Sequence, residues 1–395
     1  MPSSPRPTGR ASVTPARGSA RPAYRDGDAP GYGRRGDGGP GGGGPGGGDG
    51  RYGGEYPGAR RVRVRWGRVL LVSGIVVLVL ALAAGLGLYS YVGSLNDDMK
   101  RTSAFDGLTG DRPPKQVDGA LNILMLGTDS RDPAAKHEAG SKWRTDTIIL
   151  LHVPASHDKA YFISLPRDLW VHVPKSQSSQ YGGHSAKINA AYAWGGPPLM
   201  IQTVEGFAGV RIDHLAIVDF WGFQRMVSTV GGVKICPEMP PGQDSFKSIH
   251  KPYRTFKKGC ENMGGEKALD YIRQRKQFPR GDFARMKHQQ EFVKALMDKA
   301  TSRKVFTSPT RMTSFVKAAT KAVTVDEEFS LMDMAIQFRK LRSKDLVFLT
   351  SPHKGTGTMD GQSVVLSDKE KALSLYEAVN RDDVAGWLKQ NPQKK

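Results

Sequence analysis

The chain has 395 residues and a formal net charge of +20, with 47 glycines, 25 prolines and two cysteines. Two cysteines with no Cys-X-X-Cys motif and no Cys/His cluster argue against a zinc site. The roughly 300 residues that follow position 93 are enough to bury a substantial hydrophobic core.

The first segment, residues 1–68, is rich in Gly, Pro, Arg and Ser. Residues 1–60 contain almost no Ile, Leu or Val, so they cannot bury enough apolar surface to offset their ordering entropy, and we predict a disordered tail. The basic charge is either a solvated flank of a membrane segment or a nucleic-acid-binding arm. Several arginines directly precede the next segment: Arg60, Arg61, Arg63, Arg65 and Arg68.

Residues 69–92 predict one transmembrane helix, because no charge interrupts a stretch long enough to cross a bilayer. Trp66 and Tyr89 fit interfacial anchoring. A buried core helix or a cleaved signal peptide is the alternative, but the stretch is long and starts far from the N-terminus. With arginines before it and Asp97 and Asp98 after it, the positive-inside rule places the tail in the cytoplasm and the following domain outside the cell.

Both cysteines, Cys236 and Cys260, follow the predicted membrane helix. A lone pair in an oxidising compartment predicts a disulfide, which would stabilise the domain by roughly 3 kcal/mol in the chain-entropy model. The alternative is two unrelated buried thiols.

Residues 93–118 are predicted to be a polar linker, and residues 119–385 a single folded domain. Apolar runs predict strands at 121–126, 147–153, 160–165, 214–219, 233–236 and 346–350. Helical patterns cover 186–194, 199–207, 220–230, 268–275, 282–301, 331–341 and 369–380. This alternation predicts an α/β fold, an α–β–α sandwich with a central mixed sheet.

Charged residues lie at the ends of three consecutive predicted strands. The first is followed by the motif GTDSR at 127–131, the second is preceded by RTDT at 144–147, and the third ends in PRD at 166–168. Further candidates are Lys187 at a helix start, Arg273 and Arg275 at a helix end, and Asp282, Arg285 and Gln289 at helical spacing.

Arginine matches phosphate oxygens in a bidentate fashion and always stays charged. Several arginines in one cavity would repel one another unless an anion such as a diphosphate lay between them. Two carboxylates are too few for a calcium cage, but they suit Mg²⁺, which also takes water and phosphate oxygens. Any one of these arginines alone is better explained as a surface salt-bridge partner, so the prediction of an anion site rests on the whole set.

Seven motifs in this order resemble the LytR-CpsA-Psr (LCP) family: GTDSR, RTDTIILLHV, FISLPRDLWVHVP, KINAAYAWGG, DFWGF followed by GGV, ALDYIRQR and DFARMKHQQ. They extend from about residue 121 to residue 296. The resemblance implies an external domain on one membrane helix. It also implies an enzyme that moves cell-wall glycopolymers from a polyprenyl-pyrophosphate carrier to a peptidoglycan hydroxyl, forming a phosphodiester.

The resemblance also implies roles for individual residues. Mg²⁺ would be bound by Asp129 and Asp146. The pyrophosphate would be contacted by Arg144, Arg167, Arg273 and Arg275. Less specific roles fall on Arg131, Lys187, Asp282, Arg285 and Gln289. The chain departs from the family pattern at Ser228 and His288, and neither is an expected metal ligand.

We therefore expect a Mg²⁺-dependent phosphotransferase in which Arg144, Asp146, Arg167 and Arg275 serve catalysis. Its partners would be the lipid-linked glycan donor, the peptidoglycan acceptor and membrane lipid, but no nucleic acid. The alternatives are a non-catalytic polyprenyl-phosphate scaffold, a pyrophosphatase in which water replaces the sugar hydroxyl, and a DNA-binding regulator. The tail contains no DNA-binding motif, which argues against the regulator. High Gly, Arg and Ala usage hints at an actinobacterial source.

Overall fold

The computed structural model describes residues 93–108, 111–128, 145–302 and 308–392, together with residues 75, 77, 79, 90 and 91. The chain divides into two units, Met1–Arg65 and Trp66–Lys395, and all described residues belong to the second. The predicted tail, residues 1–68, lies outside the described residues.

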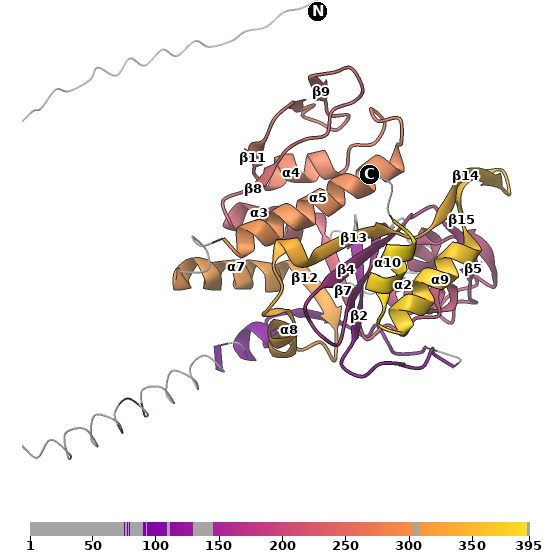
Figure 1. Ribbon diagram of the computed structural model, residues 1–395, viewed down its shortest axis with the longest axis horizontal. Coiled ribbons are helices and arrows are strands. Elements are labelled where there is room, and N and C mark those ends of the chain that lie inside the picture. The colour runs from indigo at the N-terminus through magenta and orange to yellow at the C-terminus, as the bar shows by residue number, and fades with distance from the viewer. Residues whose placement is uncertain are drawn as a thin grey trace, which may run out of the picture. The chain divides into compact units, whose positions relative to one another are not determined.

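A seven-stranded mixed sheet forms the centre of the domain (Figure 1). In spatial order its strands are β1 (Lys100–Thr102), β12 (Val323–Asp326), β7 (His214–Asp219), β2 (Leu121–Thr128), β3 (Thr145–Val153), β4 (Ala160–Leu165) and β13 (Leu346–Thr350). β2, β3 and β4 are antiparallel neighbours, whereas β7 runs parallel to β2 and β13 runs parallel to β4. The predicted central mixed sheet is confirmed.

Alternate residues of the central strands point to opposite faces of the sheet, as the two-residue period of a strand requires. Leu124 and Leu150 join the core on one face, and Ile123 and Leu151 join the core on the other. Because both faces are covered, these strands are apolar on both sides instead of alternating with polar residues.

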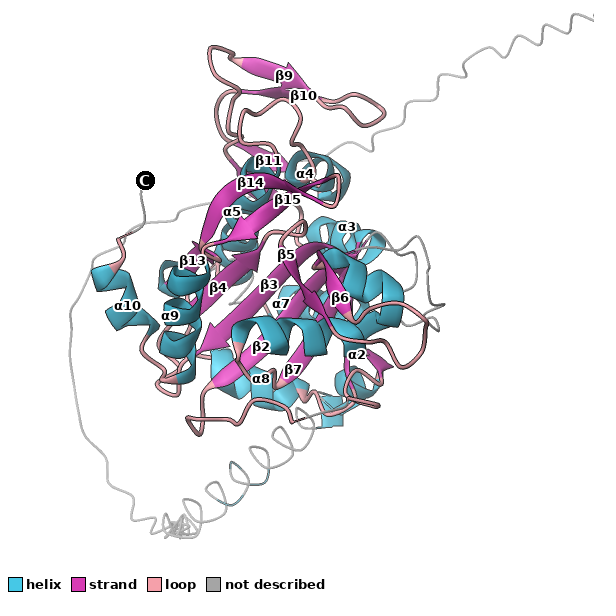
Figure 2. Cartoon of the chain, turned by 90° about the vertical axis from the view of Figure 1, so that its right-hand side faces the viewer, coloured by secondary structure: helices cyan, strands magenta, loops and turns pink. Residues whose placement is uncertain are grey.

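Helices cover both faces of the sheet (Figures 1 and 2). One face carries α2 (Asn189–Ala208), α9 (Lys369–Asn380) and α10 (Val384–Gln390). The other side of the domain is built from α3 (Phe220–Thr229), α4 (Gly265–Ile272), α5 (Asp282–Ala300), α7 (Pro309–Ala322) and α8 (Leu331–Phe338), with the short helix η1 (Ser343–Asp345) before β13. The predicted α–β–α sandwich is therefore observed.

Four two-stranded sheets surround this framework. They pair β5 (Trp170–Val173) with β6 (His184–Lys187), β8 (Val233–Ile235) with β11 (Glu261–Met263), β9 (Ser245–Lys247) with β10 (Thr255–Lys257), and β14 (His353–Met359) with β15 (Gln362–Ser367). The predicted disulfide joins Cys236, after β8, to Cys260, before β11.

Several predicted helices have different bounds in the structure. Residues 186–187 belong to β6, because Ala186 pairs with Val171 and Lys187 pairs with Trp170. The helical regions predicted at 186–194 and 199–207 form one interrupted helix, α2, whose break lies at Gly195 and Gly196. The helix predicted to extend to residue 275 instead ends with α4 at Ile272.

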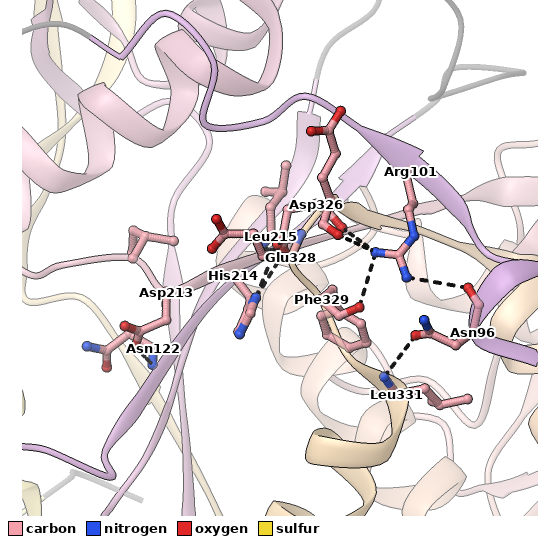
Figure 3. Close-up of polar contacts among 12 residues, drawn as sticks. Asn96, Arg101, Asn122, Asp213, His214, Leu215, Asp326, Glu328, Phe329 and Leu331 are labelled. Atoms are coloured by element: carbon pink, nitrogen blue, oxygen red, sulfur yellow. Dashed lines mark hydrogen bonds and ion pairs between the residues drawn. The ribbon is translucent and has the colours of Figure 1, made fainter. Parts of the chain in front are cut away.

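The predicted linker, residues 93–118, is only partly a linker, because its first part belongs to the folded domain. Leu95, Met99 and Ala104 are buried, and β1 pairs with β12. Arg101 fixes this segment by donating from Nη1 to the backbone carbonyls of Asp326, Glu327 and Phe329 (Figure 3). The sequence did not predict these interactions, because the hydrogen-bond acceptors of Arg101 lie far away along the chain.

The predicted membrane helix, residues 69–92, lies largely outside the described residues. In the part of the chain that the structure describes, no helix combines the length and apolar character needed to span a bilayer.

Candidate functional site

A cavity of about 510 Å³ lies between the sheet and the helices α3, α4 and α5. The sheet contributes β2, β3 and β7, whose side chains on this face include Met125, Ile149 and Val218. The helices close the opposite side. The cavity is therefore a gap in the sandwich, where packing between sheet and helices is incomplete.

Most of the cavity wall is apolar. The helices present residues at spacings of three or four, which place them on one helical face. These residues are Phe223 and Met226 from α3, Leu269 and Ile272 from α4, and Phe292, Val293 and Leu296 from α5. Such a wall suits a hydrocarbon chain.

Arg167 lies among three carboxylates at the polar end of this cavity. It is separated from the end of β4 by Pro166, and its Nη1 donates a hydrogen bond to Asp146, the second residue of β3. Its Nε lies 3.6 Å from Asp168 Oδ2 and 3.6 Å from Asp282 Oδ1. Burial acts to lower the pKa of Arg167, but the carboxylates of Asp146, Asp282 and Asp168 raise it overall.

Arg285 is the buried member of the cluster, with 4% of its surface exposed. Its Nη2 donates to the backbone carbonyl of Asp146 at 3.0 Å and to Asp282 Oδ2 at 3.0 Å. Burial lowers its pKa, although Asp282 acts in the opposite direction. Because arginine titrates so high, the side chain stays cationic all the same.

Two further cations pair with carboxylates at the charged end. Arg275 Nη1 lies 3.8 Å from Asp282 Oδ1, and Lys187 Nζ lies 3.5 Å from Asp168 Oδ1. Arg273 and Gln289 also line the cavity. The cluster joins elements far apart in the sequence: the ends of β3, β4 and β6, the segment after α4, and the first turn of α5.

Hydrogen-bonding capacity remains unused in the cluster. Arg167 Nε and Arg285 Nε are buried and make no hydrogen bond with the described residues. Leaving a buried charged donor without a hydrogen bond is costly, so a site with such donors is better suited to an added anion than to an empty interior.

The structure therefore brings together most of the described residues that the sequence singled out. Asp146, Arg167, Arg273, Arg275, Arg285 and Gln289 line the cavity, and Asp282 and Lys187 lie in the same ion-pair cluster. Asp129, Arg131 and Arg144 lie outside the described residues.

The described ranges contain no group of three or more His, Cys, Asp or Glu side chains placed to hold a metal ion. Asp146 is the one expected metal ligand that is described, and its two ion pairs there both use Oδ1. One or two carboxylates completed by phosphate oxygens suit Mg²⁺, so the residue type fits the expected ion.

Neither of the two departures from the family pattern lines this cavity. Ser228 is exposed on α3. His288 is fully buried, stacks on Tyr271 at a ring-centroid distance of 4.5 Å and meets Phe278 edge-on at 4.8 Å. Burial lowers the pKa of His288 to about 4, so at neutral pH it is an uncharged packing residue.

Sequence reasoning placed the lipid tail in an apolar groove lined by helices, but it identified neither the residues of the apolar wall nor His250. The wall residues follow ordinary amphipathic periodicity, which does not distinguish a cavity lining from a core. His250 lines the cavity from the loop after β9, next to Arg273, and burial lowers its pKa. No local motif marked it.

A sandwich that encloses an apolar cavity with arginines and carboxylates at one end defines a protein class suited to ligands with an apolar tail and an anionic head. The LytR_cpsA_psr family model matches residues 88–381, well over half of the chain, and the chain belongs to this family.

Relatives in the family include the cell wall biosynthesis protein LcpA of Corynebacterium glutamicum, 29% identical over 78% of this chain and 64% of LcpA. The polyisoprenyl-teichoic acid–peptidoglycan teichoic acid transferase TagV of Bacillus subtilis is 32% identical over 60% of this chain and 58% of TagV. The chain thus matches less than two thirds of the length of either relative.

Solved structures share the fold. The crystal structure of Bacillus subtilis TagV superposes with a TM-score of 0.54 and 26% identity, covering 68% of this chain and 98% of TagV. A structure of TagT bound to LIIa-WTA gives a TM-score of 0.53 at 21% identity, covering 69% of this chain and 96% of TagT.

Proposed function

We propose that this protein transfers a glycopolymer from a polyprenyl-pyrophosphate carrier to a hydroxyl of peptidoglycan. The observation that carries the proposal is the apolar cavity that ends at the cluster of Arg167, Arg275 and Arg285. The donor likewise has an apolar part, a long hydrocarbon chain, joined to an anionic part, a diphosphate. TagV, by its name, acts on a polyisoprenyl-linked polymer and on peptidoglycan, which supports the same substrate class.

The polyprenyl chain would lie in the cavity, against the apolar wall formed by β2, β3, β7, α3, α4 and α5, where burial of apolar surface favours binding. The pyrophosphate would lie against Arg167, Arg273 and Arg275, and against Arg144, which is outside the described residues. Guanidinium groups hold phosphate oxygens in fixed directions, so they would orient the phosphorus for attack.

The reaction is a phosphoryl transfer. The oxygen of the acceptor hydroxyl attacks the phosphorus next to the glycan, and the bond between that phosphorus and the bridging oxygen breaks. The products are a phosphodiester and a polyprenyl phosphate, and the hydroxyl proton is released. Catalysis would come mainly from positioning and from neutralising the charge that develops on the phosphate oxygens.

Asp146, together with Asp129, would hold Mg²⁺, which would supply further neutralisation of phosphate charge. Asp146 would have to share its carboxylate between this ion and its two arginine partners. Arg285 contacts the backbone carbonyl of Asp146 as well, so it would hold that carboxylate in place.

The location of the substrates fits the predicted topology. A lipid-linked donor lies in a membrane and peptidoglycan lies outside the cell, so the enzyme would be a single-pass membrane protein with a cytoplasmic N-terminus and an extracellular catalytic domain.

The test uses the purified full chain with a lipid-linked donor, a peptidoglycan fragment and Mg²⁺, and mass spectrometry of both products. We expect polyprenyl phosphate release that depends on the acceptor and is lost in Arg275→Ala and Asp146→Ala. Arg339→Ala is the control, because that arginine is exposed and contacts only its own helix end among the described residues.

Other outcomes would refute the proposal. Co-purified lipid without turnover would indicate a polyprenyl-phosphate-binding scaffold, and release that does not require the acceptor would indicate a pyrophosphatase.

A further inference from the structure

A second, smaller cavity of about 220 Å³ lies away from the arginine cluster, beside the break in α2. Its wall includes hydroxyl and amide groups from Ser176, Gln177, Ser178 and Gln202, and a carboxylate from Asp106. Among the described residues that line it, Asp106 carries the only charge. This cavity therefore suits an uncharged polar ligand better than a phosphate.

An aromatic stack adjoins this cavity. Tyr181 stacks on Trp194 with ring centroids 5.8 Å apart and an angle of 17° between planes, and His184 packs on Trp194 at 5.2 Å. Tyr181 is 39% exposed although it is a large aromatic side chain. One side of its ring lies against Trp194, and the exposed part of the ring can contact a ligand.

The loop between β5 and β6, residues 174–183, holds these rings in place. Ser176 N donates to Tyr181 O at 2.9 Å, and Ser176 Oγ donates to Trp194 O at 3.4 Å. Gly182 has a φ of +90°, and a Cβ there would lie 2.1 Å from Pro174 O, so the tight fold of the loop requires glycine. A surface ordered before binding loses little entropy when a ligand arrives.

We propose that Tyr181 and the adjoining cavity form a saccharide subsite, which takes an uncharged sugar of one of the two glycans that the proposed function joins. A pyranose ring has a face of C–H groups that packs on the negative face of an aromatic ring. Its hydroxyls project from the rim, where Gln177, Ser178 and Asp106 can exchange hydrogen bonds with them.

The position of the subsite supports this assignment. The β5–β6 hairpin lies against α2 (Figure 2) and connects the two sites. At one end of the hairpin Lys187 lies 3.5 Å from Asp168 in the charged cluster, and at the other end His184 belongs to the aromatic stack. Three steps along a strand cover about 10 Å, so a glycan held at the arginines by its phosphate reaches Tyr181 within a few sugar units.

Equilibrium binding tests the subsite without requiring transfer. The full chain is titrated with an uncharged N-acetylglucosamine tetrasaccharide by calorimetry. An aromatic contact of this kind is worth about 0.5–1.5 kcal/mol, so Tyr181→Ala should weaken binding roughly two- to tenfold, and Tyr181→Phe should retain it. Gln177→Ala, at an exposed residue, should also weaken binding, whereas Leu373→Ala, on the exposed face of α9, should not.

No saturable binding by the wild type, or equal binding by the wild type and a folded Tyr181→Ala, overturns the proposal. If Tyr181→Ala does not fold, an unchanged affinity in Gln177→Ala overturns it instead. In the transfer assay, a raised KM for the peptidoglycan fragment assigns the sugar to the acceptor, and a raised KM for the lipid-linked donor assigns it to the donor. Saccharide binding without transfer would reject the proposed function and keep the subsite.

Discussion

The pairing of Arg285 with Asp282 organises the charged end of the cavity, and its removal should destabilise the fold measurably. The Arg285 side chain is 5% exposed and that of Asp282 is 18% exposed, with 2.9 Å between Nη2 and Oδ1. Breaking a fully buried ion pair costs about 3–5 kcal/mol, and partial exposure of the carboxylates reduces this, so Arg285→Met should lower the free energy of unfolding by roughly 3 kcal/mol.

A double-mutant cycle separates this pair from the other contacts of Arg285. Asp282→Asn, Arg285→Met and the double variant are compared with the wild type by urea denaturation, followed by tryptophan fluorescence. The Nη2 contact with the Asp146 carbonyl is lost in both variants that lack Arg285, so it cancels in the cycle. The remaining coupling free energy should be roughly 1–2 kcal/mol, the usual size for a hydrogen bond to a charged group. A coupling below about 0.5 kcal/mol would refute the assigned role, since additive effects of that size are expected for independent sites.

Three other predictions concern stability. Replacing Cys236 and Cys260 together by Ala should cost roughly 3 kcal/mol, because the disulfide closes a loop with a sequence separation of 24; an unchanged midpoint in urea would contradict this. Burial lowers the pKa of His288 to about 4, whereas an unfolded histidine has a pKa near 6.5, so the free energy of unfolding should fall by up to roughly 3 kcal/mol as the pH drops from the higher value to the lower one. The variant His288→Leu should show a smaller loss, and the same dependence of stability on pH in the variant and the wild type would show the assignment to be wrong. Gly206→Ala should stabilise α2 by about 0.5–1 kcal/mol because a Cβ there meets nothing within 4 Å, whereas Gly265→Ala should destabilise the domain because its Cβ would lie 2.2 Å from Gln224 O. If thermal unfolding showed shifts in Tm of the same sign for the two variants, the packing of α3 against α4 would be contradicted.

The framework of the fold was predictable because its central strands are buried on both faces. β2, β3 and β4 each contain a run of buried apolar residues, and β4 has the bounds that the sequence predicted, 160–165. β6 was missed because His184 and Ser185 are exposed and the strand has four residues. β12 was missed because four residues of sequence VTVD carry little periodic signal, and a distant partner, β7, fixes them in the sheet.

The charged part of the candidate site was predictable because arginine and aspartate recur at the ends of three successive strands and because their motifs match the family. The partners within the cluster were not, since Asp282 meets Arg167 only through the packing of α5 against the sheet. The saccharide subsite was also beyond sequence reasoning, because Tyr181 and Trp194 come from a loop and a helix 13 positions apart along the chain.

In the proposed function, the arginine cluster supports transfer of a phosphoryl-linked glycan to a sugar hydroxyl. The most direct measurement is mass spectrometry of the new linkage after incubation of donor, peptidoglycan fragment and enzyme, with Arg167→Ala beside Arg339→Ala. We predict a phosphodiester product from the wild type and from Arg339→Ala, formed together with equimolar polyprenyl phosphate, and at least a hundredfold less from Arg167→Ala, as is roughly typical when one preorganised charge contact is removed. Equal product from Arg167→Ala, or a product without phosphorus in the linkage, would contradict this role of the arginine cluster.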